Sequence, residues 1–166
     1  MNYAGINACD MCNGEGLRVS LFVSGCRIGC KGCFNKKAWD FKYGKEFTKD
    51  TREYILSLVN QPHIKGLSIL GGEPLDDNNR DTVRELVKYI KLQLPEKDIW
   101  LWTGYDISKF YNDPILDYLD VVVDGKFIKE LKDPSLKYRG SINQKIHIVE
   151  DIINERLLQQ LNSRNT

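Results

Sequence analysis

Residues 17–33, LRVSLFVSGCRIGCKGC, decide the fold, because a short strand pattern runs directly into a loop with three cysteines. Leu17–Ser24 is rich in apolar and β-branched residues, which is typical of a core strand. Cys26, Cys30 and Cys33 follow with the spacing C-x3-C-x2-C. Three thiolates on one tight loop can hold three corners of an iron–sulfur cube, and one iron then stays open, because a [4Fe–4S] cluster ordinarily takes four cysteines. We therefore expect a core strand that delivers a metal-binding loop to one end of a sheet.

The chain has five cysteines, and all of them lie within 25 consecutive residues. An odd number clustered in this way fits metal binding or redox chemistry better than a disulfide framework. Cys9-x2-Cys12 and Cys30-x2-Cys33, separated by 17 residues, also have the spacing of a zinc ribbon, with Cys26 as a spare thiol. A non-catalytic zinc-binding module is therefore an alternative, although the core-strand pattern between the two pairs does not suit a small zinc knuckle.

Further apolar runs predict strands, and helical patterns lie between several of them. The expected later strands are Leu67–Leu70, Ile99–Thr103, Leu119–Asp124 and Ile146–Val149. One helix is expected to begin at a capping-box-like pair, Asp50 and Glu53. The other helical patterns are Val83–Leu94, Ile107–Tyr111, Pro114–Tyr118 and an amphipathic stretch over Ile152–Leu161.

Strands that alternate with helices favour right-handed βαβ units and a mainly parallel sheet, and so an α/β fold. A complete eight-unit (β/α) barrel needs about 250 residues. This chain has 166 residues and no linker-like stretch, so we expect a single domain over residues 1–166. Its architecture should be an open, partial (β/α) barrel with about five or six parallel strands. Residues 145–166 should form a C-terminal strand and helix extension.

Composition and charge argue against two classes of partner. The 24 Lys and Arg residues against 23 Asp and Glu residues give a formal net charge of +1, so no strong field attracts a nucleic acid backbone. No apolar run approaches the roughly 18 residues that a membrane span needs. Met1–Ala4 lacks the basic and apolar regions of a signal peptide. We expect a cytoplasmic protein that binds neither nucleic acid nor a membrane.

A glycine-rich turn, Gly71-Gly72-Glu73-Pro74, follows the expected strand Leu67–Leu70 directly. Two glycines let a ligand approach the main chain, where carbonyl oxygens and the Glu73 carboxylate could hold an amino-acid ammonium. A plain strand exit is the alternative. Between Cys33 and Gly71 lie 37 residues, which is room for one helical crossover between adjacent parallel strands. Both loops should then open at the same edge of the sheet.

C-x3-C-x2-C followed by an aromatic residue, Phe34, with G-G-E-P at the next strand end, resembles the radical S-adenosylmethionine (SAM) enzymes. In that family three cysteines hold a [4Fe–4S] cluster, and the open iron binds the amino and carboxylate groups of SAM. The resemblance implies that Cys26, Cys30 and Cys33 are the metal ligands. It also implies that the partial barrel is of the radical SAM type.

The resemblance implies two groups of SAM-binding residues and assigns no catalytic side chain. The segment Gly32-Cys33-Phe34 would run alongside the adenine of SAM. The turn Gly71-Gly72-Glu73 would contact the methionine portion of SAM. Asp124 and Lys126 would face the SAM ribose, the SAM carboxylate or the incoming substrate. A turn with a surface ion pair is the alternative for these last two residues.

Four more segments narrow the resemblance to the glycyl-radical-activating enzymes, and among these to the group that acts on anaerobic ribonucleoside-triphosphate reductase. They are Asn13–Gly16, Lys97–Tyr105, Val123–Phe127 and Arg139–Gln144. The family's pattern does not require Cys9 or Cys12, which we interpret as small buried or bystander thiols.

Trp100 and Trp102 alternate onto one face of a strand, which predicts core packing.

This resemblance implies a radical SAM activase that cleaves SAM to a 5′-deoxyadenosyl radical and generates a glycyl radical on the catalytic subunit of the reductase. The implied partners are that subunit and a low-potential electron donor such as flavodoxin. Separately, the unpaired strand edges of an open barrel predict extensive contact with the partner enzyme and a homodimer as one further possibility. Activation of pyruvate formate-lyase, modification of a small molecule, and the zinc-binding module stay open as alternatives.

Overall fold

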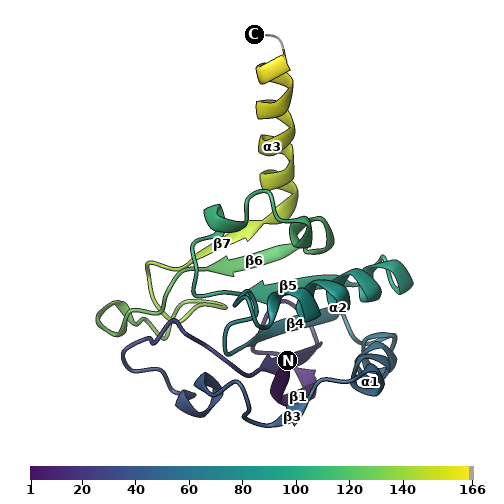
Figure 1. The fold of residues 1–166 in the computed structure, drawn as a ribbon, viewed down its shortest axis with the longest axis vertical. Coiled ribbons are helices and arrows are strands. Elements are labelled where there is room, and N and C mark those ends of the chain that lie inside the picture. Colours follow the sequence, from purple (N-terminus) through teal and green to yellow (C-terminus); the bar gives the residue numbers. More distant parts are fainter. Residues whose placement is uncertain (165–166) are drawn as a thin grey trace.

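A computed structural model describes residues 1–164, and within them one seven-stranded sheet carries three α-helices (Figure 1). The strands lie in the order β3-β1-β2-β4-β5-β6-β7. Their bounds are β1 Asn2–Asp10, β2 Arg18–Val23, β3 Lys45–Glu46, β4 Gly66–Gly71, β5 Asp98–Trp102, β6 Val121–Asp124 and β7 Lys145–Ile148. The α-helices are α1 Lys49–Val59, α2 Arg80–Gln93 and α3 Val149–Arg164. Short 3-10 helices lie at η1 Lys36–Trp39, η2 Ile107–Phe110, η3 Pro114–Tyr118 and η4 Lys129–Leu131.

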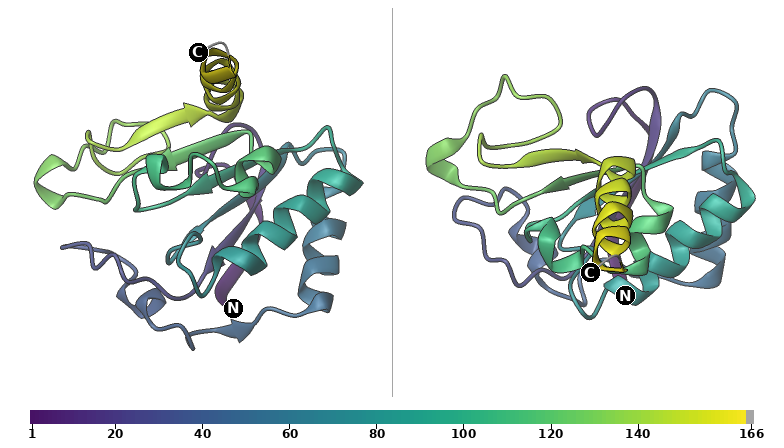
Figure 2. Two further views of the ribbon diagram at one scale, coloured as in Figure 1. Left: turned by 45° about the horizontal axis from the view of Figure 1, so that its top comes forward. Right: turned by 90° about the horizontal axis from the view of Figure 1, so that it is seen from above.

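Four parallel strands, β2, β4, β5 and β6, form the centre of the sheet. Val19 of β2 pairs with Leu67 of β4, and Leu67 pairs with Ile99 of β5. These side chains are fully buried in a core that also contains the apolar faces of α1 and α2. Both helices lie on the same side of the sheet (Figure 2). Because the four strands are parallel, the loops that follow them meet at one edge of the sheet.

The expected partial barrel of the radical SAM type, with five or six parallel strands, is wrong. The sheet is mixed, because β1, β3 and β7 run antiparallel to their neighbours. Only seven residues separate β1 from β2, whereas a parallel crossover needs about a dozen or more, so these strands pair antiparallel. Residues 125–144 likewise return from β6 to β7 without an α-helix, and β7 pairs antiparallel with β6.

The apolar pattern predicts five of the strands and does not predict β1 or β3. The five bounds differ from the expected ones by at most two residues. β1 has the sequence NYAGINACD, and most of its side chains are half-buried or exposed, so it has no apolar alternation to detect. β3 has two residues, and both are exposed.

Helix α1 begins at a capping box that differs from the expected one. The Thr48 hydroxyl accepts from the Thr51 backbone N–H, and the Thr51 hydroxyl accepts from the Thr48 backbone N–H, each at 3.3 Å. This reciprocal pair, and not Asp50 with Glu53, satisfies the free N–H groups of the first turn. The Glu53 carboxylate instead accepts from the Tyr89 hydroxyl at 2.9 Å, which joins α1 to α2.

Helix α3 packs on the body only through its first turns. Val149 and Ile152 are buried, whereas Leu157, Leu158 and Leu161 are 49%, 61% and 56% exposed. The helix projects away from the sheet beyond β7 (Figure 1). The expected amphipathic packing is therefore confirmed for the first half of the helix and wrong for the second. Within residues 1–164 no helix has both the length and the apolar character needed to cross a membrane.

The face of the sheet opposite α1 and α2 carries a smaller, aromatic cluster. The Trp100 ring stacks on Trp102 with ring centroids 5.7 Å apart, and the Tyr138 ring meets Trp100 edge-on at 5.1 Å. Arg18 lies below Trp100 and is fully buried. Its Nε donates to the Ser68 hydroxyl at 2.7 Å. The expected core packing is confirmed for Trp100, and Trp102 is only half-buried.

Replacing Arg18 by Ala should lower the free energy of unfolding by about 3–5 kcal/mol, because Asp98 loses its partner in a largely buried ion pair. Urea unfolding followed by circular dichroism measures the change. Arg84→Ala is the matched control, because the Arg84–Asp81 pair is more exposed on α2 and such pairs contribute about 0–1 kcal/mol. Equal losses in the two variants would contradict the structural role of Arg18.

Candidate functional site

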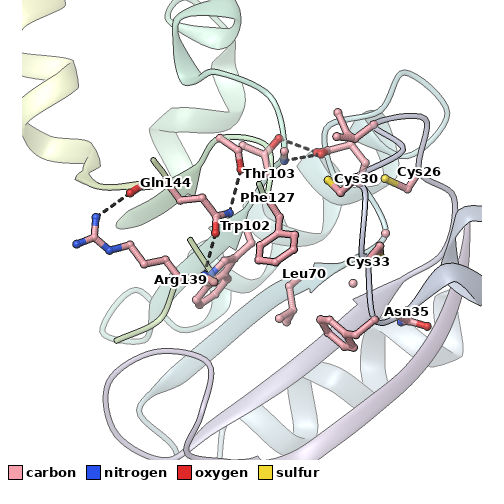
Figure 3. A pocket seen from close by; sticks show the side chains of 18 of the residues that line it. Cys26, Cys30, Cys33, Asn35, Leu70, Trp102, Thr103, Phe127, Arg139 and Gln144 are labelled. Carbon is pink, nitrogen blue, oxygen red and sulfur yellow. Dashed lines mark hydrogen bonds between the residues drawn. The ribbon is translucent and has the colours of Figure 1, made fainter. Parts of the chain in front are cut away.

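A cavity of about 580 Å³ opens at the carboxyl ends of the parallel strands (Figure 3). It lies on the face of the sheet that α1 and α2 leave uncovered. Phe22 of β2, Leu70 of β4 and Trp102 of β5 line its inner wall. Loops that follow β2, β4 and β5 line its remaining sides, together with the long loop 125–144 that follows β6. The cavity therefore stands where the parallel strands deliver their loops.

The three-cysteine loop, residues 25–35, follows β2 directly. At its base the Gly25 N–H donates to the Ala38 carbonyl of η1 at 2.8 Å. Gly25 has a φ of +93°, and a Cβ there would overlap the Phe41 ring, so this position requires glycine. All three cysteines of the motif are half-buried and line the cavity, namely Cys26, Cys30 and Cys33 (Figure 3).

The glycine turn, Gly71–Pro74, contacts the three-cysteine loop because β2 and β4 are adjacent and parallel. The Gly72 N–H donates to the Val23 carbonyl, and the Glu73 N–H donates to the Gly25 carbonyl, each at 2.8 Å. A Cβ on Gly72 would lie 2.6 Å from the Gly25 carbonyl oxygen, so glycine permits this close approach. The expectation that both loops open at one edge is confirmed. Gly71 and Gly72 also line the cavity with their main chain.

The three thiols have the chemistry that an iron–sulfur cluster needs. Burial raises the pKa of the Cys26 and Cys30 thiols. At Cys30 the Phe127 N–H and the Lys126 ammonium act in the opposite direction. Thiols lose their protons when they bind metal, so metal binding here should strengthen as the pH rises. Three thiols on one loop that face a common cavity fit a cluster with one open iron.

Glu73 connects two loops of the site and is 1% exposed. Its Oε1 accepts from the Thr103 hydroxyl at 2.7 Å and from the Leu75 N–H at 2.9 Å, and its Oε2 accepts from the Gly104 N–H at 2.7 Å. Burial raises the pKa of Glu73 to about 7, although these three donors favour the charged form. The structure thus makes Glu73 a link between the glycine turn and the end of β5.

Asp124 and Lys126, expected near SAM, do not line the cavity. Asp124 is buried on the other side of β6, where its Oδ2 accepts from the Ile107 N–H at 2.9 Å. Its Oδ1 lies 3.0 Å from Nε2 of His147 on β7. Asp124 thus joins β6 to η2 and β7 from inside the protein, which differs from the surface ion pair of the alternative. Lys126 lies near enough to Cys30 for its ammonium charge to act against the rise in the pKa of that thiol.

Of the loop 125–144, sequence reasoning assigned only Lys126 to the site. The Trp102 indole N–H donates to the Tyr138 carbonyl at 2.7 Å and so fixes this loop beside the inner wall (Figure 3). Tyr138 has a φ of 62°, in the left-handed region that disfavours side chains with a Cβ. Gln144 Nε2 donates to the Gly125 carbonyl at 2.9 Å and closes the loop on itself. The sequence signals for this loop are the segments Val123–Phe127 and Arg139–Gln144, which carry part of the family resemblance.

Cys9 and Cys12 are both exposed, so of the two expectations for them, buried or bystander thiols, the buried one is wrong and the bystander one stays a prediction. Cys12 lines the cavity, whereas Cys9 does not. Across residues 1–164 no three or more His, Cys, Asp or Glu side chains are arranged to hold a single metal ion. The same finding applies to Cys26, Cys30 and Cys33. What separates the two sets is that all three motif cysteines line the cavity, whereas Cys9 of the proposed zinc set does not.

Comparison with known proteins identifies the family. Residues 12–147 match the family model for a 4Fe-4S single cluster domain, which covers both the three-cysteine loop and the glycine turn. Proteins from Vibrio cholerae, Escherichia coli and bacteriophage T4 that are named anaerobic ribonucleoside-triphosphate reductase-activating protein are each 44% identical to this chain. The matches cover 89%, 89% and 88% of this chain and 97%, 98% and 93% of those proteins. The chain therefore belongs to the family of anaerobic ribonucleoside-triphosphate reductase-activating proteins.

Replacing Glu73 by Gln should flatten the pH dependence of stability between about pH 4.5 and pH 7 in the cluster-free protein. Because burial raises the pKa of Glu73 to about 7 from 4.5, the folded state holds this proton more tightly than the unfolded state. The resulting stability, up to about 3 kcal/mol, is fully present below pH 4.5 and lost as the pH rises through 7.

Thermal unfolding at a series of pH values measures this effect. Glu96→Gln is the control, because Glu96 is exposed in the loop after α2 and should leave the slope unchanged. A Glu73→Gln variant with the slope of the unmodified protein would contradict the prediction.

Proposed function

We propose that the protein is a radical SAM activase of the anaerobic ribonucleoside-triphosphate reductase. One electron from an external donor cleaves SAM to methionine and a 5′-deoxyadenosyl radical. This radical takes an α-hydrogen from a glycine of the reductase's catalytic subunit, which leaves a glycyl radical and 5′-deoxyadenosine. The observation that carries the proposal is that the three motif cysteines and the glycine turn line one cavity.

Cys26, Cys30 and Cys33 would hold one [4Fe–4S] cluster, which when bound supplies an open iron for SAM and the electron for its sulfonium. The other residues bind and orient. The main chain of Gly71–Gly72 lines the cavity and offers carbonyl oxygens to an ammonium group. Gly32 and Phe34 also line the cavity, and the Phe34 ring is fully exposed, so it is free to cover an adenine.

In this proposal Glu73 and Asp124 would hold the loops and strands around the cavity in place. Glu73 keeps the glycine turn against the end of β5, and Asp124 keeps β6 against η2. The Lys126 ammonium offsets negative charge at Cys30. Trp102 and Phe127 present aromatic surface to the cavity and exclude water from a reactive intermediate.

Replacing Cys26 by Ala should abolish SAM cleavage, because a cluster with two cysteine ligands is not held. Cys12→Ala is the matched control, since Cys12 lines the same cavity but lies outside the motif. After anaerobic reconstitution, about four irons with matching sulfide are expected in the unmodified protein and in Cys12→Ala. Iron analysis and chromatographic detection of 5′-deoxyadenosine under reducing conditions measure both properties. Equal losses in the two variants would overturn the ligand assignment.

We also propose that the electron donor docks on a basic rim beside the cysteines. Residues 24–47 and 125–145 contain 12 Lys and Arg residues but only 4 Asp and Glu residues, whereas the rest of the chain has 12 against 19. The two segments touch, because Lys129 packs over Gly32 and Lys31 lies 3.4 Å from Glu130. We define the basic rim as Lys31, Lys36, Lys37, Lys126, Lys129 and Lys132.

Within residues 1–164, Lys31 is the one lysine of the rim that forms an ion pair, with Glu130. Arg84, Lys91 and Arg156, outside the rim, each form an ion pair with an Asp. Among the described residues, Lys36 and Lys37 form no ion pair, and both are exposed on η1 next to the cysteines. A rim of this kind attracts an acidic protein and speeds its association at low salt. A low-potential donor with an acidic face, such as a flavodoxin, fits this surface.

Lys36→Glu with Lys37→Glu should slow SAM cleavage driven by reduced flavodoxin about tenfold at low salt. Cleavage driven by dithionite, a small reductant, should be unaffected and shows that the cluster is intact. Lys49→Glu with Lys65→Glu is the matched control, because both lysines are exposed on other parts of the chain and the change in net charge is the same. An equal loss in the control would show a general charge effect and contradict the docking site.

A homodimer and a location in the cytoplasm belong to the same proposal. The exposed leucines of α3 and the unpaired edge of β7 are surfaces on which a second copy could pack. All five cysteines are free thiols, which suits a reducing compartment.

A further inference from the structure

Asn79 lies between the two loops that carry the motifs, and its side chain joins them. The residue is 1% exposed and stands at the N-terminus of α2. Its Nδ2 donates to the Ser24 carbonyl and to the Glu73 carbonyl, each at 2.9 Å, and lies 3.3 Å from the Gly25 carbonyl. Ser24 and Gly25 directly precede Cys26, and Glu73 belongs to the glycine turn. One amide group therefore connects the base of the three-cysteine loop to that turn.

This use of Asn79 is not what its position in the helix would favour. Asn is a preferred N-cap residue, yet the Asn79 side chain accepts no hydrogen bond from the first turn of α2. Its Oδ1 is buried and has no hydrogen-bond partner within residues 1–164. An unsatisfied buried oxygen costs stability. The Asn79 side chain thus does not cap helix α2, and its Oδ1 is unpaired. Its Nδ2 instead contacts three backbone carbonyls of the site.

A second contact joins the same two segments. Arg27 lies between Cys26 and Cys30, and its guanidinium forms an ion pair with Asp76. Asp76 is 1% exposed and lies between the glycine turn and Asn79. The segment 73–79 therefore holds the three-cysteine loop both before its first cysteine and after it.

We propose that Asn79 is a positioning residue, which sets the distance and orientation between the three-cysteine loop and the glycine turn. The inference rests on the proposed function, in which SAM contacts both segments at once. All three cysteine ligands lie on one loop, so a cluster can assemble without Asn79. The backbone N–H groups of Gly72 and Glu73 already tie the glycine turn to that loop, and the amide adds a side-chain link that fixes their relative orientation. Loss of the amide should therefore weaken SAM binding more than cluster assembly.

Asn79→Asp tests the proposal most directly, because it keeps the size of the side chain and replaces the NH2 donor by an oxygen that faces three carbonyl oxygens. Asn79→Ala removes the donor without adding repulsion, and it serves if Asn79→Asp does not fold. Asn78→Ala is the matched control, because Asn78 is the exposed neighbour of Asn79. Its side chain makes no hydrogen bond within the described residues.

Three measurements separate positioning from general stability. Hydrogen exchange in the cluster-free protein should be faster for residues 24–35 in both Asn79 variants and unchanged in Asn78→Ala. After anaerobic reconstitution, the iron content should stay that of the unmodified protein. The dissociation constant for SAM should rise about tenfold, and the change that SAM causes in the electron paramagnetic resonance spectrum of the reduced cluster should weaken.

The outcomes distinguish this inference from the proposed function. If the unmodified protein forms no 5′-deoxyadenosine from SAM, the proposed function fails and this inference fails with it. If the unmodified protein cleaves SAM and the Asn79 variants bind it equally well, only this inference fails. Loss of iron in proportion to loss of SAM binding would also overturn it, because Asn79 would then serve cluster assembly and not positioning.

Discussion

The parallel pairing of β2 with β4 is the constraint on which the whole site depends. Val23 at the end of β2 pairs with Gly71 at the end of β4, so the segments that follow them leave the sheet side by side. Backbone hydrogen bonds then continue from the sheet into the loops, through Gly72 to Val23 and through Glu73 to Gly25. A one-residue slip in this register would turn inward-facing side chains outward and separate the two motifs. The fully buried core of β2, β4, α1 and α2 makes such a slip costly.

Buried polar side chains hold the loops at the ends of the strands, which backbone pairing within the sheet does not fix. Glu73 reaches the end of β5, Asn79 reaches the start of the three-cysteine loop, and Arg18 ties the loop after β1 to β4 and β5. Each of these groups is almost fully buried and makes several hydrogen bonds. Buried hydrogen bonds of this kind hold polar groups in one arrangement, although the Asn79 Oδ1 is unpaired. The cavity is therefore shaped by polar contacts within its walls, while its surface is mainly apolar.

The sequence was sufficient for the centre of the fold and for the motif residues, because both depend on short-range patterns. The apolar runs of β2, β4, β5 and β6, with the helical spacing of α2, leave little ambiguity. The edges were not predictable, since β1 has no alternation and the direction of β7 depends on how loop 125–144 returns. The side on which Asp124 projects depends on register, and a family motif cannot supply it. Trp102 was expected in the core because alternation does not say which face of a sheet lies open.

The Trp102 indole belongs to two walls of the cavity at once. Its ring forms part of the inner wall, while its N–H holds the carbonyl of Tyr138, the only described non-glycine residue with a positive φ. That backbone conformation stores strain of about 1–3 kcal/mol, which persists only where neighbours enforce it. The Tyr138 ring, edge-on against Trp100, adds a second restraint. The inner wall and the loop beside it are therefore linked, so a ligand cannot displace the indole without breaking its hydrogen bond to Tyr138 or moving that residue's backbone.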